Sequence, residues 1–346
     1  MTALDTTQSV STDFHCPDCS PFLNWDIDQF VSEYENIVVF ESLVTTLKLQ
    51  AELDDSLEAK AVNVLEFVTP DDRKSADDFV SSHGRAIDDS SSNFVQSIVV
   101  LISSTSQAIT TAAMKMLYRV FWLCSAGVRY PLVQADLIPQ LIMTLHPQSL
   151  SFVETEDIHT SLMGIITTSL SFASAYGLTE LEIKNENEQQ AVHETVFLQV
   201  IVPSEKYIRH MCVNRFSIVD SEQSTEFMTL LTRLLQISPS YQPTMDFVLN
   251  MPIFATIPSC LTFFGTNHTI WAFLYSMVDI QQKWNEKGGY AQFMWKNVQR
   301  LLRTEGSEDV MEEKLRNDKN EYFGRYIVDD SIKWGNLLGM NLPQRE

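Results

Sequence analysis

The chain has 346 residues, 45% of them hydrophobic, and one compact core seldom grows beyond ~250–300 residues, so two domains or an elongated repeat array is expected. Only 11 residues are glycine, which argues against an all-β fold with its many tight turns. The formal net charge of −21 repels nucleic-acid phosphates and anionic lipid headgroups, so we predict a protein or extended-peptide partner of neutral or basic charge and no nucleic acid.

Residues 1–21 are rich in serine and threonine and poor in apolar residues, and we expect this segment to be disordered. It has neither the basic start nor the apolar stretch of a secretory signal. Cys16 and Cys19, preceded by His15, have the spacing of half a zinc site, but no second pair in the sequence supplies the other two ligands. We therefore predict no bound metal and no cofactor.

The five cysteines are an odd and widely spaced set, which does not suit a disulfide framework. The three that follow the N-terminal segment, Cys124, Cys212 and Cys260, lie among apolar residues and are expected to be small core side chains. Reduced thiols and the missing secretory signal together predict an intracellular, cytoplasmic protein.

Helical patterns follow the N-terminal segment. Asp55 and Glu58 have the spacing of a capping box that opens a helix, and apolar residues follow it at Ala59, Val62, Leu65 and Phe67. Ser75 and Asp78 are spaced to open a shorter helix, and Asp88–Ser92 is interpreted as a polar linker.

The clearest helix runs from Ile109 to Cys124. Its apolar residues recur at helical spacing and form one continuous face: Ile109, Ala112, Ala113, Met116, Leu117, Val120, Phe121 and Cys124. The same spacing recurs between Phe227 and Leu235 and between residues 270 and 278. These stripes predict an all-α fold.

The apolar pattern also repeats along the chain. Residues 94–102 match residues 137–145 at an offset of 43, with apolar pairs at five positions. The Ile109 helix has a similar match to residues 158–170 at an offset of 46. A period of ~40–47 residues is that of armadillo and HEAT units, whose stacked helices bury a continuous core.

Residues 93–146 resemble one armadillo repeat followed by the last helix of the next. Ser106–Cys124 is similar to the family's second helix, Val128–Asp136 to its short link, and Leu137–Ile142 to the start of its third helix. Asp136 stands where the family usually has glycine. Aspartate tolerates left-handed backbone better than most residues, so we expect the turn to be kept.

The resemblance implies a right-handed armadillo/HEAT-like α-solenoid, a superhelix of stacked helices, over residues 22–305. The chain as a whole also resembles an expanded, uncharacterised group of armadillo-like protist proteins, and that resemblance implies no activity. Glu180–His193 interrupts the pattern and is interpreted as a loop, or as the exposed start of a helix at Glu188. Residues 306–346 are predicted to form a charged helix and a C-terminal tail.

Phe247–Val278 carries no formal charge over 32 residues, a pattern that a membrane span would also show. Pro252, Pro258 and the polar run at 265–268 divide it into pieces shorter than the ~20 apolar residues that a span requires. We interpret it as two helices buried between neighbours and predict no transmembrane segment.

The sequence motifs do not predict an enzyme. Glycine-rich phosphate-binding signatures are missing, and His193-Glu194 begins like a metalloprotease helix without its second histidine. None of the six tryptophans has an asparagine four residues later, as armadillo proteins of the nuclear-import kind do. Lys296, Arg300 and Arg303 form a small basic stripe, interpreted as a solvated helix face, with docking of an acidic peptide as the alternative.

The leading hypothesis is a non-catalytic scaffold that binds a protein or extended peptide on the concave face of the solenoid. In armadillo folds the third helix of each unit lines this face. The resemblance then places five candidate partner-binding residues on the open side: Ser97, Val100, Gln140, Met143 and His210. The alternative for these residues is ordinary surface packing. The alternative functions are an enzyme with a site assembled across helices and a peripheral membrane or trafficking adaptor.

Overall fold

A computed structural model describes residues 35–49, 55–83, 90–145, 156–214 and 221–253, together with Phe273, Ser276 and Ile280. Of these residues 88% are helical and none lies in a strand, which confirms the predicted all-α class for the described part of the chain. Within these ranges, every helix is too short or too polar to cross a membrane.

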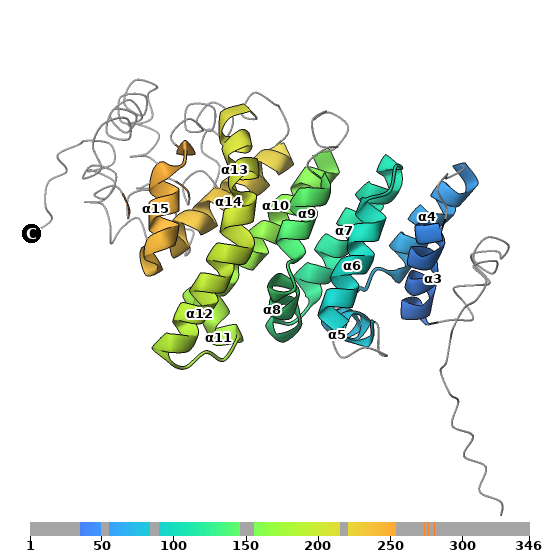
Figure 1. Cartoon of the computed structure of the whole chain (residues 1–346), viewed down its shortest axis with the longest axis horizontal. Helices are drawn as coiled ribbons and strands as arrows, with labels where there is room; N and C mark the ends of the chain where they lie inside the picture. The colour runs from blue at the N-terminus through green and yellow to red at the C-terminus, as the bar shows by residue number, and fades with distance from the viewer. Residues whose placement is uncertain are drawn as a thin grey trace, which may run out of the picture.

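The helices follow one another in chain order along the long axis of the molecule, from α3 to α15 (Figure 1). The α-helices are α3 (Asn36–Leu49), α4 (Asp55–Val68), α5 (Arg73–Ser82), α6 (Ser90–Ile102), α7 (Gln107–Leu123), α8 (Ala126–Gln134), α9 (Leu137–Leu145), α10 (Glu156–Leu170), α11 (Ala175–Glu180), α12 (Glu186–Val196), α13 (Val202–Asn214), α14 (Ser221–Ile237) and α15 (Gln242–Asn250). Short non-α segments lie between some of them: the 3₁₀ turns η1 (Ser171–Ala173) and η3 (Ser238–Ser240), and the π-helical η2 (Phe197–Ile201).

Helices about three places apart in the chain pack side by side. α3, α6, α9 and α13 contact one another in succession, and we call them row 1; η2, which leads into α13, also contacts α9. α4, α7, α10 and α14 form row 2 in the same way, and the short helices α5, α8 and α11 form row 3. The rows pack on each other, as α3 does on α4 and α6 on α7.

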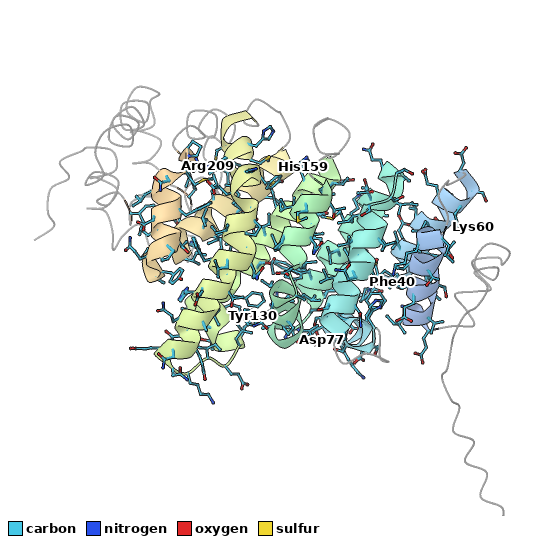
Figure 2. The ribbon with its side chains drawn as sticks, in the orientation of Figure 1. Phe40, Lys60, Asp77, Tyr130, His159 and Arg209 are labelled. Carbon is cyan, nitrogen blue, oxygen red and sulfur yellow. The ribbon has the colours of Figure 1, made fainter. Side chains whose placement is uncertain are left out.

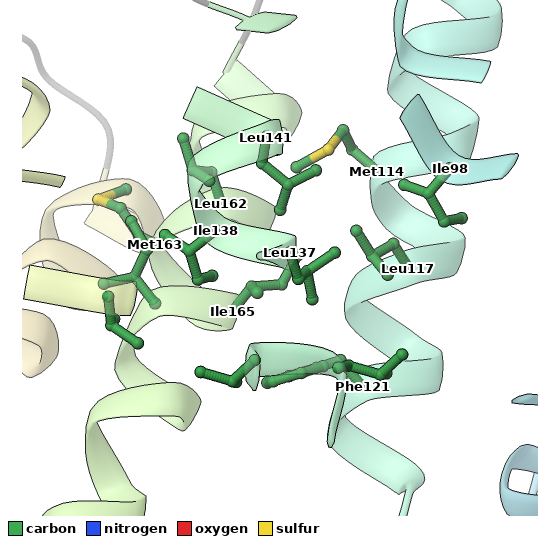
Figure 3. Close-up of a cluster of buried hydrophobic side chains, with 14 of the residues drawn as sticks. Ile98, Met114, Leu117, Phe121, Leu137, Ile138, Leu141, Leu162, Met163 and Ile165 are labelled. Carbon is green, nitrogen blue, oxygen red and sulfur yellow. The ribbon is translucent and has the colours of Figure 1, made fainter. Parts of the chain in front are cut away.

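Row 2 lies at the centre of the core. Every residue from Ser161 to Leu170 of α10 is buried, and α10 packs against both α7 and α14. Figure 3 shows apolar side chains of α6, α7, α9 and α10 pointing toward one another, among them Ile98, Leu117 and Leu141. The predicted face of α7 is confirmed, since all its members except the half-buried Ala112 are buried: Ile109, Ala113, Met116, Leu117, Val120, Phe121 and Cys124.

Helix α5 begins at Arg73, two residues before the predicted start at Ser75. The Asp72 carboxylate accepts a hydrogen bond from the Ser75 N–H at 2.9 Å and so caps the first turn. This bond holds the pKa of Asp72 below its usual value. An aspartate at this position satisfies a backbone donor that the helix itself leaves unpaired.

The polar segment Glu180–His193 is mostly helix rather than loop, because α12 begins at Glu186. The Asn185 side chain accepts a hydrogen bond from the Glu188 N–H at 2.9 Å. Glu186 and Glu188 both lie in the first turn, where the helix dipole stabilises negative charge. The alternative interpretation, an exposed helix start, is therefore the better one, although the start lies two residues earlier.

The short link in the armadillo resemblance is itself largely helical. Ala126–Gln134 forms α8 with Pro131 inside it, and the Ala135 N–H donates to the Pro131 carbonyl at 2.9 Å. Asp136 then has a φ of 61°, in the left-handed region. The prediction that aspartate keeps this turn in place of glycine is confirmed.

α12, η2 and α13 form one continuous helical run whose middle is widened. The Val202 N–H donates to the Phe197 carbonyl, five residues back instead of four. Pro203 comes next, and a proline lacks an N–H while its ring crowds the carbonyl four residues earlier. The π-helical segment therefore accommodates a proline that would otherwise end the helix.

Several predictions concern segments outside the described residues, and they stay predictions. They are the disorder of residues 1–21, the Cys16 and Cys19 pair, the core position of Cys260, the basic stripe at Lys296, Arg300 and Arg303, and the tail at 306–346.

Leu117→Ala is expected to lower the free energy of unfolding by roughly 2–5 kcal/mol, because this fully buried side chain lies in the middle of the α7 face. Urea unfolding followed by circular dichroism measures the change. Arg119→Ala, an exposed position on the same helix, is the control and should shift stability by less than about 0.5 kcal/mol. A loss that small for Leu117→Ala would mean that α7 buries a different face.

Candidate functional site

Row 1 carries all five residues proposed for partner binding. Ser97 and Val100 lie on α6, Gln140 and Met143 on α9, and His210 on α13. Met143 is 70% exposed, whereas Val100, Gln140 and His210 are half-buried. The structure therefore places the candidates on three adjacent helices, with Met143 the most accessible of them.

Ser97 does not face the open side as expected. It is only 7% exposed, and its hydroxyl lies 2.9 Å from Nε2 of His83, the residue that ends α5. The His83 ring packs edge-on against Phe40 of α3 and Phe94 of α6. The prediction that Ser97 is accessible is wrong, because His83 covers this side of α6.

Gln96 is the residue of α6 that points outward, and it was missed. It is exposed, and Asn93, Val99 and Val100 around it are half-buried. The 43-residue offset aligned Ser97 with Gln140, which fixes the matching helices but not their rotation. The helical phase could have found Gln96, since it lies opposite the buried face of α6: Phe94, Val95, Ile98, Leu101 and Ile102.

Two further exposed apolar residues lie on the helical run formed by α12, η2 and α13. They are Leu198 of η2, which is 51% exposed, and Val202 of α13, which is 45% exposed. Both were missed because the candidate residues on this run were limited to His210. η2 and α13 both contact α9, so these exposed apolar residues lie on elements next to the helix that carries Met143.

The middle of row 1 has no charge of its own. α6 and α9 contain no Asp, Glu, Lys or Arg, and among the α-helices of the described part they are alone in this. Charge returns at α13, where Arg209 Nε lies 2.8 Å from Glu205 Oε1 and Nη1 donates to the Asn250 carbonyl at 3.2 Å. The surface of α6 and α9 is therefore built from amides, hydroxyls and apolar side chains.

His83 is the buried titratable residue next to this surface. Burial lowers its pKa, and the nearby Glu41 carboxylate, with Oε1 at 3.5 Å from Nδ1, acts in the opposite direction. Through Glu41 and Ser97 the ring connects α3, the end of α5 and α6. We interpret it as a neutral link beneath the row 1 surface.

A second polar cluster lies on row 3, at the edge of the molecule where Figure 2 shows Asp77 and Tyr130. The Asp77 carboxylate accepts a hydrogen bond from the Ser125 N–H at 2.8 Å, which connects α5 to the start of α8. Arg129 of α8 lies 3.3 Å from Glu180 of α11. Because these carboxylates have donors on other helices, we interpret the cluster as a set of links between helices.

His193, the start of the metalloprotease-like motif, is buried on α12. Its ring stacks on Tyr241, with centroids 6.0 Å apart and planes 9° apart. Burial lowers the pKa of His193. Across the described ranges, no three His, Cys, Asp or Glu side chains gather closely enough to hold a metal ion.

Comparison with known proteins does not assign the chain to a family. No family model, no curated protein and no solved structure matches the chain. The armadillo likeness therefore rests on the residues quoted from the sequence.

His83 is expected to make folding sensitive to mild acid. Its folded-state pKa is below the unfolded value near 6.5, so its contribution to stability is present above about pH 6.5 and is lost as the pH falls through the folded pKa. The free energy of unfolding should fall between about pH 7 and 5, and fall less in His83→Gln. Urea titrations at each pH measure this. Because the two proteins differ only at residue 83, an identical pH slope would contradict the prediction.

Cys124 and Cys212 are expected to be unreactive in the folded chain. Both are buried, and burial raises the pKa of each thiol to about 12, helped at Cys124 by Asp77. Iodoacetamide near pH 8 should leave both unmodified without denaturant and modify both in urea, as peptide mass spectrometry can show. Rapid modification of either thiol in the native protein would contradict its burial.

Proposed function

We propose that this chain is a non-catalytic scaffold, a right-handed armadillo/HEAT-like α-solenoid whose row 1 binds a partner protein or an extended peptide. Stacked helical units of this kind contact mainly their neighbours and leave one long face open for binding.

The arrangement of the helices supports the solenoid part of the proposal. Each row continues through successive contacts, α3 to α6 to α9 to α13 in row 1 and α4 to α7 to α10 to α14 in row 2. The left-handed turn at Asp136, between α8 and α9, matches the glycine turn of the family's pattern. Helices in chain order along one axis are also what a repeat array requires.

The observation that carries the binding part is the accessible surface of row 1. Within the described ranges, the large exposed apolar side chains of α3, α9, η2 and α13 are Leu49, Met143, Leu198 and Val202. These side chains lie on row 1 helices and on η2, which contacts α9, and exposed apolar groups favour contact with another protein because covering them removes apolar area from water. On α9 such a group stands on a helix without charges, in a chain whose net charge is −21.

Affinity capture from the native cell, with mass spectrometry of the retained proteins, tests this function. The bait is the full chain, compared with the double variant Gln140→Glu, Met143→Glu. The variant should weaken the captured partner by more than about tenfold, or ~1.4 kcal/mol, while its thermal unfolding midpoint stays unchanged. The matched control is the double variant Arg119→Glu, Trp122→Glu, which places two carboxylates at exposed positions of α7 in row 2.

Three results would count against the proposal. Equal retention by both double variants would mean that row 1 is not the binding face. Unfolding of the row 1 variant would mean that these side chains hold the core. If the wild-type chain retains no protein above an unrelated bait, the scaffold function itself is wrong.

A further inference from the structure

We infer that the segment bound across α6 and α9 is an extended stretch of a partner protein with uncharged side chains, and not a basic one. This inference rests on the proposed function and names the chemistry of its partner. It starts from two facts about these helices, their lack of charged residues and the one exposed residue on each, Gln96 on α6 and Met143 on α9.

Charged side chains are the ones most rarely buried, so a helix without them can be covered on all sides. α6 and α9 instead leave Gln96 and Met143 exposed and keep Asn93, Val100 and Gln140 half-buried. Every other α-helix in the described ranges carries at least one Asp, Glu, Lys or Arg. The uncharged surface is therefore confined to the two adjacent helices in the middle of row 1.

The chemistry of this surface decides which side chains of a partner can pack against it. A charged side chain pressed against α6 and α9 would lose water without gaining an opposite charge from either helix, and that desolvation is costly. An uncharged segment pays only a small desolvation free energy, because the side-chain amides of Gln96 and Gln140 can donate hydrogen bonds to its extended backbone and accept hydrogen bonds from it. Met143 is unbranched and polarizable, so it can pack against apolar side chains of different shapes.

The size of the surface sets the length of the bound segment. Packed helices lie about 8–10 Å apart, so two of them span roughly 20 Å. An extended chain rises about 3.3 Å per residue, which gives roughly six residues across α6 and α9. Beyond α9 the same segment would meet Leu198 and Val202, which are also exposed and apolar.

The inference can be tested on the full chain by selection from a display library of random peptides. The peptides should have about twelve residues, twice the roughly six that span α6 and α9. The enriched peptides should be depleted in Asp, Glu, Lys and Arg relative to the input library. Their affinity should change by less than about twofold between low and high salt, since no exposed ion pair contributes. Both Met143→Glu and Met143→Lys should weaken binding by more than about tenfold, whereas Met143→Leu should retain it.

The matched control is Trp122→Glu, which alters a similarly exposed apolar residue on α7, at 60% exposure, and should leave binding within about twofold. Gln96→Glu is a second variant on row 1, at an exposed position, and should weaken binding even if a Met143 variant fails to fold. Thermal unfolding of each variant separates lost binding from lost structure.

Other outcomes would overturn the inference in distinguishable ways. Basic, salt-sensitive peptides that bind more tightly to Met143→Glu would show a partner of the wrong charge, with the scaffold function intact. Uncharged peptides insensitive to Met143 and Gln96 variants would place binding on another face. No enriched peptide at all would count against the scaffold function as well. Self-association, or binding to phosphatidylcholine vesicles, that depends on Met143 would identify a second copy or a membrane as the occupant instead.

Discussion

The close packing of α10 between α7 and α14 is the constraint on which the rest of the core depends. Gly164 makes it possible on the α7 side, because a Cβ at this position would run into the ring of Tyr118. The buried hydroxyls of Thr168 and Ser169 cost little, since each donates to the carbonyl four residues earlier at 2.8 Å. A helix that hides its own polar groups in this way can be covered on every side.

With α10 buried at the centre of row 2, rows 1 and 3 differ in the chemistry of the side chains that they expose. Row 3 is held by charge: Asp77 connects α5 to α8, and the Arg129–Glu180 pair connects α8 to α11. Those charges already have partners within the chain, so they contribute to the fold rather than to a docking surface. The middle of row 1, α6 and α9, carries no charged residue, and beneath it lies the buried contact between His83 and Ser97. The difference explains why row 1 is the better candidate for binding.

How much the sequence could predict varied with the helix. α7 was predictable because its apolar residues share a single phase. The apolar residues quoted for α4 do not share one environment, since Leu65 is fully buried and Phe67 is 46% exposed. The core also takes Leu57 and Val64, and packing against α3 and α7 selects the buried face. The repeat offset likewise paired α6 with α9, and these two helices contact each other. The choice of Ser97 over Gln96 depended on which face of α6 is buried, and packing against the neighbouring helices decides that.

The net charge of the chain and the surface of row 1 act at different distances. A charge of −21 is felt over roughly a Debye length, about 8 Å at physiological salt, and chiefly raises the rate at which basic proteins arrive. Contact with α6 and α9 is decided at van der Waals distance, where neither helix has a carboxylate of its own to pair with an incoming lysine or arginine. A partner that is basic overall but binds through an uncharged segment satisfies both conditions. Electrostatic steering and side-chain selection would then be separate properties of one interface, the first sensitive to salt and the second not.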